Sequence, residues 1–222
     1  MDAKLFVQAI LKFALGFVLV GLLVILPGGF AYTQGWLFMA VLFVPMFIAG
    51  LVMMKVSPDL LRKRLSAKEK QSEQQTVVKL SAMMFLAGFV IAGLDHRFSW
   101  LPLPMWLSYA AVVLFLLAYV LYAEVLRENA YLSRTVEVQE GQKVISTGLY
   151  GIVRHPMYMA TLILFLSMPL VLGSLISFVV FLAYPIIIVK RIKNEEEVLE
   201  AGLEGYSEYK EKVKYRLIPF IW

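Results

Sequence analysis

Six apolar runs, separated by polar or turn-forming segments, dominate the pattern of the chain. The runs are residues 5–26, 36–54, 77–94, 104–123, 156–172 and 175–189. Apolar runs of about 20 residues are long enough to cross the hydrocarbon core of a bilayer as helices. The pattern therefore predicts an all-α, polytopic membrane protein with about six transmembrane helices, followed by a cytosolic C-terminal helix and tail.

The last two apolar runs are joined by a very short turn at Gly173 and Ser174. So short a connection makes neighbouring helices antiparallel, as in a helical hairpin. We therefore expect the start of the fifth run to lie beside the end of the sixth. This brings two polar segments together at one membrane face: residues 146–158, STGLYGIVRHPMY, and residues 191–197, RIKNEEE.

Composition agrees with a membrane location and excludes several kinds of site. Of the 222 residues, 60% are hydrophobic, and the mean hydropathy of +0.76 is too high for an ordinary soluble domain. Because cysteine is absent, disulfides, thiolate zinc sites and cysteine nucleophiles are ruled out. The two histidines, His96 and His155, are far apart and predict no metal site, and His96 is expected in an exposed loop.

The basic residues predict both the partner and the orientation of the chain. The net charge is +5, and the 21 Lys and Arg residues flank the apolar runs, which favours the anionic headgroups of a lipid bilayer over nucleic acid. If the N-terminus lies on the cytoplasmic side, six spans place only one of these basic residues, Arg97, in a loop on the opposite side of the membrane. By the positive-inside rule, we expect both termini and both polar segments to be cytoplasmic, in an inner or internal cell membrane.

No internal repeat or linker divides the chain, so residues 1–222 are predicted to form a single membrane domain. Residues 1–123 hold four spans and a basic cytosolic loop, residues 55–79. This loop would either lie on the membrane surface as an amphipathic segment or remain a solvated loop. Residues 130–147 alternate polar and apolar side chains and could form a short β-hairpin around Gly141.

The motif VRHPMY marks a predicted helix start that carries several polar residues. Pro156 suits the first position of a helix because its ring fixes φ and it lacks an N–H group. Arg154 and His155 would lie beside the free N–H groups and the positive dipole end of that helix, which suit a carboxylate or phosphate. Tyr158 lies in the first turn and can point at the same spot. Alternatively, Arg154 and Tyr158 only anchor a capped helix start at the membrane interface.

The segment RIKNEEE follows the last predicted span. On a helix, Arg191 and Glu195 share a face, whereas Glu196 is rotated away from Arg191 by about 140°. Packed beside the VRHPMY motif, these residues would suit a ligand that carries both signs of charge. The alternative is a solvated run of charges after a membrane helix.

Together the motifs resemble those of the isoprenylcysteine carboxyl methyltransferase family, within the wider group that includes phospholipid methyltransferases. The matching segments are SPDLLRKRL, GLDHRFSW, the region of Asn129, STGLYGIVRHPMYMA, LGS, RIKNEEEVL and the tail GLEGYSEYKEKVKYRLIPFIW. They extend over most of the chain after residue 57, and the pair G-x-Y-x-x-V-R-H-P-x-Y and R-x-x-x-E-E is the most specific part. At Met159 and Ala160, many relatives have a variable residue followed by glycine. Alanine in place of that glycine would narrow the binding pocket that the resemblance implies.

The resemblance implies S-adenosylmethionine-dependent methyl transfer to a carboxylate, isoprenylcysteine-like, or to another group of an amphiphilic or lipid substrate. Residues 124–222 would be the cofactor-binding catalytic region. The residues implied in cofactor binding are Tyr150, Arg154, His155, Pro156, Tyr158, Glu195 and Glu196. The residues implied in catalysis are Asn129, Glu196 and Arg191, of which Arg191 would position the acceptor. No G-x-G-x-x-G fingerprint is present, so a Rossmann cofactor site is not expected.

Three other functions fit part of the pattern. A phospholipid N-methyltransferase would act on an amine, which must lose a proton, and a glutamate could serve as the base. An NADPH-dependent membrane reductase of the sterol reductase type has a similar C-terminal region, but it would need a larger pocket and more basic residues. A membrane scaffold without catalysis, whose charges bind lipid headgroups, is the third.

Overall fold

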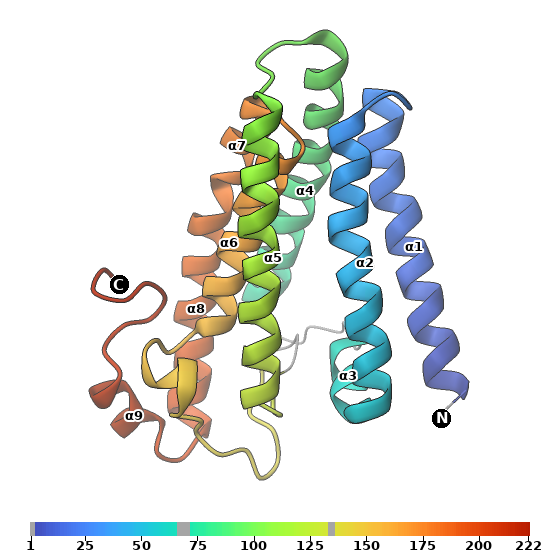
Figure 1. Cartoon of the computed structure of the whole chain (residues 1–222). Coiled ribbons are helices and arrows are strands. Elements are labelled where there is room, and N and C mark those ends of the chain that lie inside the picture. Colours follow the sequence, from blue (N-terminus) through green and yellow to red (C-terminus); the bar gives the residue numbers. More distant parts are fainter. Residues whose placement is uncertain (1–2, 66–71, 133–135) are drawn as a thin grey trace.

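Helices form most of the structure, a computed structural model that describes residues 3–65, 72–132 and 136–222 (Figure 1). The longer helices are α1 (Ala3–Gly28), α2 (Thr33–Val56), α4 (Ser72–Phe98), α5 (Met105–Glu128), α6 (Pro156–Val171) and α8 (Ala183–Gly202). The shorter ones are α3 (Pro58–Leu65), the 3₁₀ helix η1 (Gly148–Gly151), α7 (Leu175–Phe181) and α9 (Tyr206–Lys212). In the described part of the chain there is no strand, only an isolated bridge between Pro102 and Ser174, so the predicted all-α class is confirmed.

Within the described residues, five helical segments are long and apolar enough to cross a membrane. They are Ala3–Gly28, Thr33–Val56, Gln74–Phe98, Met105–Glu128 and Leu175–Gly202, the last of which joins α7 and α8. The sixth apolar helix, α6, has 16 residues and extends about 24 Å, which is less than a hydrocarbon core of about 30 Å. The predicted polytopic membrane architecture is therefore confirmed, with five full-length spans and one shorter helix.

The bundle is built around α6, which packs along α5, and around α4, which contacts α1, α7 and α8. Its interior is rich in aromatic rings, of which Phe38, Phe115 and Phe181 are fully buried. Large apolar side chains such as Leu11 and Leu15 face outward from α1, as expected of a surface in contact with lipid. The turn after α6 reverses the chain into α7, so the predicted helical hairpin is confirmed.

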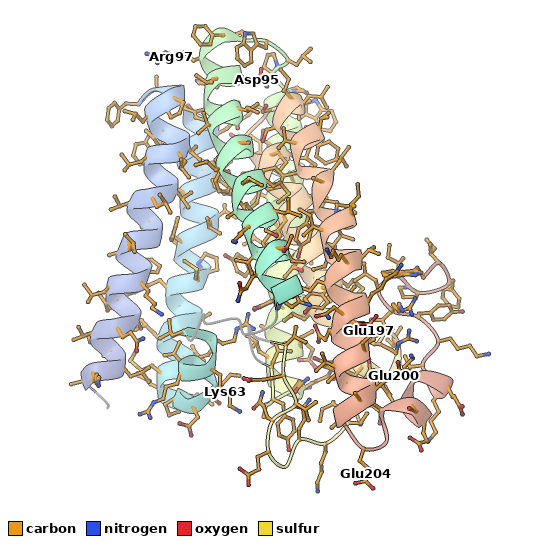
Figure 2. The ribbon with its side chains drawn as sticks, turned by 180° about the vertical axis from the view of Figure 1, so that it is seen from behind. Lys63, Asp95, Arg97, Glu197, Glu200 and Glu204 are labelled. Carbon is orange, nitrogen blue, oxygen red and sulfur yellow. The ribbon has the colours of Figure 1, made fainter. Side chains whose placement is uncertain are left out.

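A buried carboxylate ties the loops together at the end of the bundle away from the N-terminus (Figures 1 and 2). Asp95 on α4 accepts a hydrogen bond from the backbone N–H of Leu101 at 2.7 Å and another from the hydroxyl of Ser174. The next residue, His96, is half-buried and stacks on the ring of Tyr32, with the centroids 4.1 Å apart. The prediction of an exposed loop histidine was therefore wrong, because α4 continues past this residue.

The predicted basic loop, residues 55–79, begins with α3, which buries Leu60 and Leu61, exposes Arg62, and leaves Lys63 and Arg64 half-buried against other parts of the protein. This arrangement supports the amphipathic interpretation over the solvated loop, and α3 lies at the same end of the bundle as the N-terminus (Figure 1). Residues 66–71 of this loop lie outside the described residues.

The predicted β-hairpin does not form in residues 136–147, which are irregular with a turn at Gly141. Two glutamines close this turn, which has no flanking strands among the described residues. The N–H of Gln142 donates to the carbonyl of Gln139 at 3.1 Å, and the N–H of Gln139 donates to the side-chain oxygen of Gln142 at 2.9 Å. The hairpin prediction was wrong here, and residues 133–135 lie outside the described residues.

We predict that Gly93→Ala lowers the unfolding temperature of the detergent-solubilised protein. A Cβ at Gly93 of α4 would lie 2.8 Å from the carbonyl oxygen of Val24 and 2.9 Å from the amide nitrogen of Gly28 on α1. Since these are backbone atoms, the two helices must separate, and overpacking of this kind costs about 1–3 kcal/mol. Gly50→Ala is the matched control, because a Cβ at Gly50 meets nothing within 4 Å. An equal change in both variants would contradict this account of α1–α4 packing.

Candidate functional site

The start of α6 is held by the C-terminal tail. Pro156 is the first residue of α6, as predicted, and His155 precedes it. The backbone N–H groups of Arg154 and His155 donate to the carbonyl oxygens of Tyr215 and Arg216, both at 2.9 Å. The tail therefore fixes the backbone of the two residues that precede the helix.

A buried carboxylate lies at the centre of this contact. The side chain of Glu196, on α8, is only 4% exposed. Its Oε1 accepts a hydrogen bond from Arg154 Nε at 2.7 Å and lies 3.2 Å from His155 Nε2, and its Oε2 accepts one from Arg216 Nε at 2.8 Å. Arg154 Nη1 also donates to two carbonyls of the tail, at 2.7 and 2.9 Å. Because a buried charge is stable only when it is paired and hydrogen-bonded, the contacts of Glu196 with these three side chains hold α6, α8 and the tail together.

The other glutamate of the pair faces a different cluster. The hydroxyl of Tyr158 donates to the carboxylate of Glu195 and accepts a hydrogen bond from Arg191 Nε at 2.9 Å. The guanidinium of Arg191 lies over the Tyr158 ring, 5.7 Å from its centroid, and the His155 ring stacks on the same ring. Arg191 and Glu195 thus meet on one face of α8, as the helical spacing predicts, while Glu196 points into the ion cluster.

A third contact joins the end of α5 to η1. Asn129 Nδ2 donates to the hydroxyl of Tyr150 at 2.9 Å. The N–H of Leu149 donates to Glu128 Oε2 at 3.1 Å, which holds η1 against α5. Gly148 has a φ of +52°, and a Cβ there would overlap the Glu128 carboxylate, so this turn requires glycine.

These three contacts surround one cavity of about 100 Å³. The predicted site residues that line it are Asn129, Tyr150, Arg154, His155, Tyr158, Arg191 and Glu195. Apolar walls come from Leu132, Val136, Val144, Ile145, Met157, Leu199 and Leu203, and α9 adds Tyr206 and Tyr209. Charges of both signs and aromatic rings therefore face a partly apolar space.

The cavity lies at the end of the bundle that also holds α3 and α9 (Figure 1). Lys63, Glu200 and Glu204 lie at this end, whereas Asp95 and Arg97 lie at the opposite end (Figure 2). The two polar segments that the sequence places on one membrane face are thus brought together in space.

Two predicted residues do not line the cavity. Pro156 is buried at the start of α6, and Glu196 is buried in the ion cluster behind Arg154 and His155. Their direct contact with a cofactor stays a prediction, as do the roles of the residues that line the cavity.

Several residues at this site are not among the predicted site residues. Arg216 completes the ion cluster, and Tyr206 and Tyr209 form a wall of the cavity, in a tail segment that resembles the family. Gln74 of α4 is fully buried, and its amide donates to Asn194 Oδ1 at 2.7 Å and to the carbonyl of Arg191 at 3.3 Å. No local pattern marks Gln74, because its partners lie more than 100 residues away in the chain.

Burial affects the protonation of the tyrosines around the cavity. It raises the pKa of Tyr150, Tyr206 and Tyr209 above the usual range of a phenol. All three therefore remain neutral hydroxyls at physiological pH. Across the part of the chain that the structure describes, no group of three or more His, Asp or Glu side chains is placed to hold a metal ion.

Comparison of the sequence with known families gives one match. Residues 106–201 match the sequence profile of the isoprenylcysteine carboxyl methyltransferase (ICMT) family. This stretch contains every predicted site residue, from Asn129 to Glu196. The resemblance stated from the motifs is therefore confirmed over these residues.

Curated proteins that are similar in sequence include two Delta(14)-sterol reductases. A Delta(14)-sterol reductase from Mus musculus is 31% identical over 91 residues, which are 40% of this chain and 22% of the reductase. A Delta(14)-sterol reductase from Methylotuvimicrobium alcaliphilum is 25% identical over 135 residues, which are 54% of this chain and 32% of the reductase. The chain thus spans less than one third of the length of these relatives.

The fold is shared with a solved structure of the eukaryotic intramembrane Ras methyltransferase ICMT, which aligns with a TM-score of 0.57 at 20% sequence identity. The alignment covers 91% of this chain and 74% of that one. At this level of identity, the likeness establishes the arrangement of the helices.

We predict that Glu196→Gln lowers the unfolding temperature in detergent, because it leaves Arg154 and Arg216 without a counter-charge. Removing one partner of a buried ion pair costs about 3–5 kcal/mol, and the partial exposure of Arg216 favours the lower end of this range. Glu197→Gln is the matched control, since Glu197 is exposed on the same helix (Figure 2). Unfolding is measured by circular dichroism. Equal unfolding temperatures for the two variants would contradict a stabilising role for the ion cluster.

Proposed function

We propose, from the isoprenylcysteine carboxyl methyltransferase family pattern in residues 106–201, that this chain is an integral membrane methyltransferase that uses S-adenosylmethionine. The observation that carries the proposal is the cavity, which brings together the charged and aromatic residues of both family motifs. Its acceptor would be a carboxylate of an isoprenylcysteine-like amphiphile, with a phospholipid amine as the alternative.

The chemistry of the cavity fits this cofactor, which carries an ammonium, a carboxylate and a sulfonium. Glu195 offers a carboxylate for one of the cationic groups, and His155 offers a donor for the anionic one. Tyr150 and Tyr158 supply aromatic walls. Since Pro156 and Glu196 do not line the cavity, we propose that they act by holding Arg154 and His155 in place.

Most of the catalysis would come from positioning. When bound, the cofactor supplies an electrophilic methyl group on a sulfonium, which becomes a neutral thioether after transfer. Arg191 would orient an acceptor carboxylate, which attacks without losing a proton, and Asn129 would fix Tyr150 in the wall beside it. An amine acceptor would have to lose a proton, and Glu195 is the carboxylate in the cavity that could accept it.

The distribution of charge supports an active site on the cytoplasmic face. The cavity shares its end of the bundle with the N-terminus and the basic helix α3 (Figure 1). Basic residues concentrate on the cytoplasmic side of membrane proteins, so we propose that the cavity and both termini face the cytoplasm. The substrate would then approach from the bilayer, since both the apolar spans and the apolar cavity walls suit an amphiphile.

A nucleotide-dependent reductase is the second candidate, because both curated relatives reported above are sterol reductases. Titration calorimetry on the detergent-solubilised protein separates the candidates. We predict that S-adenosylhomocysteine binds and that NADPH does not, because the cavity offers few basic side chains for a 2′-phosphate. Binding of NADPH without S-adenosylhomocysteine would replace the proposal, and binding of neither would favour a scaffold.

We predict that Arg191→Lys impairs use of the acceptor more than binding of the cofactor. Lysine keeps the charge but loses the planar fork that orients a carboxylate. We expect kcat/KM for a synthetic S-isoprenylated cysteine derivative to fall about tenfold, with little change in S-adenosylhomocysteine affinity. Lys193→Arg is the control, because Lys193 is exposed on the same helix. A loss of cofactor affinity as large as the loss of kcat/KM would assign Arg191 to the cofactor instead.

A further inference from the structure

Tyrosine hydroxyls surround the cavity, and they differ in whether they have a hydrogen-bond partner. The tyrosines that line it are Tyr131, Tyr150, Tyr158, Tyr206 and Tyr209. Four of these hydroxyls have partners. Tyr131 donates to the carbonyl of Gly141, and Tyr150 accepts from Asn129. Tyr158 pairs with Glu195 and Arg191, and Tyr209 donates to the carbonyl of Tyr150. Among the described residues, the hydroxyl of Tyr206 is buried and has no partner.

The ring of Tyr206 is nevertheless firmly placed. Tyr206 is 4% exposed and packs in an apolar cluster with Leu203, Tyr209 and Val213. Gly205, with a φ of +82°, provides the turn that directs the chain into α9. The side chain is thus held where its hydroxyl cannot turn to bulk water.

The surroundings of this hydroxyl are those of the cavity. It lies close enough to Glu196, Glu195 and Arg154 for their charges to influence it. Burial and then the charge of Glu196 raise its pKa, so the phenol keeps its proton and remains a donor. A buried donor without an acceptor destabilises a protein, which makes such a group rare unless something else binds it.

We propose that the Tyr206 hydroxyl is a ligand-binding group that donates a hydrogen bond to the bound nucleoside-type methyl donor. The proposal rests on the proposed function and deepens it, because Tyr206 lies beyond residues 106–201 and is not among the predicted site residues, although the tail segment that contains it resembles the family. The acceptor that the hydroxyl lacks is supplied by an oxygen or nitrogen of the ligand.

The place of Tyr206 in the cavity wall is consistent with this pairing. Tyr206 and Tyr209 bring α9 to the lining of the cavity, so a ligand bound there would lie against α9.

The test compares Tyr206→Phe with Tyr209→Phe, since each removes one hydroxyl from a neighbouring buried ring. In Tyr206→Phe no protein hydrogen bond is lost, so we expect an unfolding temperature equal to or above that of the wild type. In Tyr209→Phe the carbonyl of Tyr150 loses its donor at 2.7 Å, so we expect a lower unfolding temperature. Calorimetry should show S-adenosylhomocysteine binding about 3- to 10-fold more weakly to Tyr206→Phe than to the wild type.

Two outcomes would overturn the proposal while leaving the proposed function intact. One is wild-type S-adenosylhomocysteine affinity in Tyr206→Phe. The other is a drop in its unfolding temperature as large as that of Tyr209→Phe, which would mean that the hydroxyl has a structural partner. Failure of the proposed function looks different, because the wild-type protein itself would then not bind S-adenosylhomocysteine.

Discussion

The pairing of the Glu196 carboxylate is the interaction on which the rest of the site depends. One buried negative charge is shared by Arg154 at the start of α6, by His155 beside it, and by Arg216 of the tail. Desolvating these groups separately would be costly, so they are stable only as a set. The set joins three segments that are distant in the chain, and the cavity lies directly against it.

The two consecutive glutamates of α8 have different surroundings because successive residues of a helix are about 100° apart. Glu195 meets Tyr158 at the cavity, whereas Glu196 meets arginines behind it. A paired acidic motif can therefore combine a group that faces a ligand with a group that stabilises the surrounding structure. Because Glu195 faces the cavity while Glu196 pairs with arginines behind it, the partly apolar cavity holds charges of both signs and Glu196 still has its counter-charges.

The membrane sets a further constraint on the architecture. Polar contacts close both ends of the bundle, with Asp95 and Ser174 at one end and the ion cluster at the other. Between them the helices bury aromatic rings and expose aliphatic side chains, as a lipid environment favours. The short length of α6 is compatible with this arrangement, since its first residue adjoins the polar cluster rather than open solvent.

Local patterns were sufficient for much of the fold and for most of the predicted site residues to be found at the cavity. Apolar runs indicated the helices, because a backbone in lipid must satisfy its own hydrogen bonds. The short turn at Gly173 indicated the hairpin, and helical spacing separated Glu195 from Glu196. Even so, the alternation of polar and apolar residues predicted a hairpin around Gly141, where the structure has a turn without strands.

Contacts between distant segments emerged from the folded structure alone. The pairing of Arg216 with Glu196, the stacking of His96 on Tyr32 and the unpaired hydroxyl of Tyr206 follow no local periodicity. Each of these features depends on how a distant element packs against the residue. The sequence alone does not specify that packing. Hydrophobic spacing thus explains which segments become helices, whereas long-range packing and charge pairing determine which side chains meet.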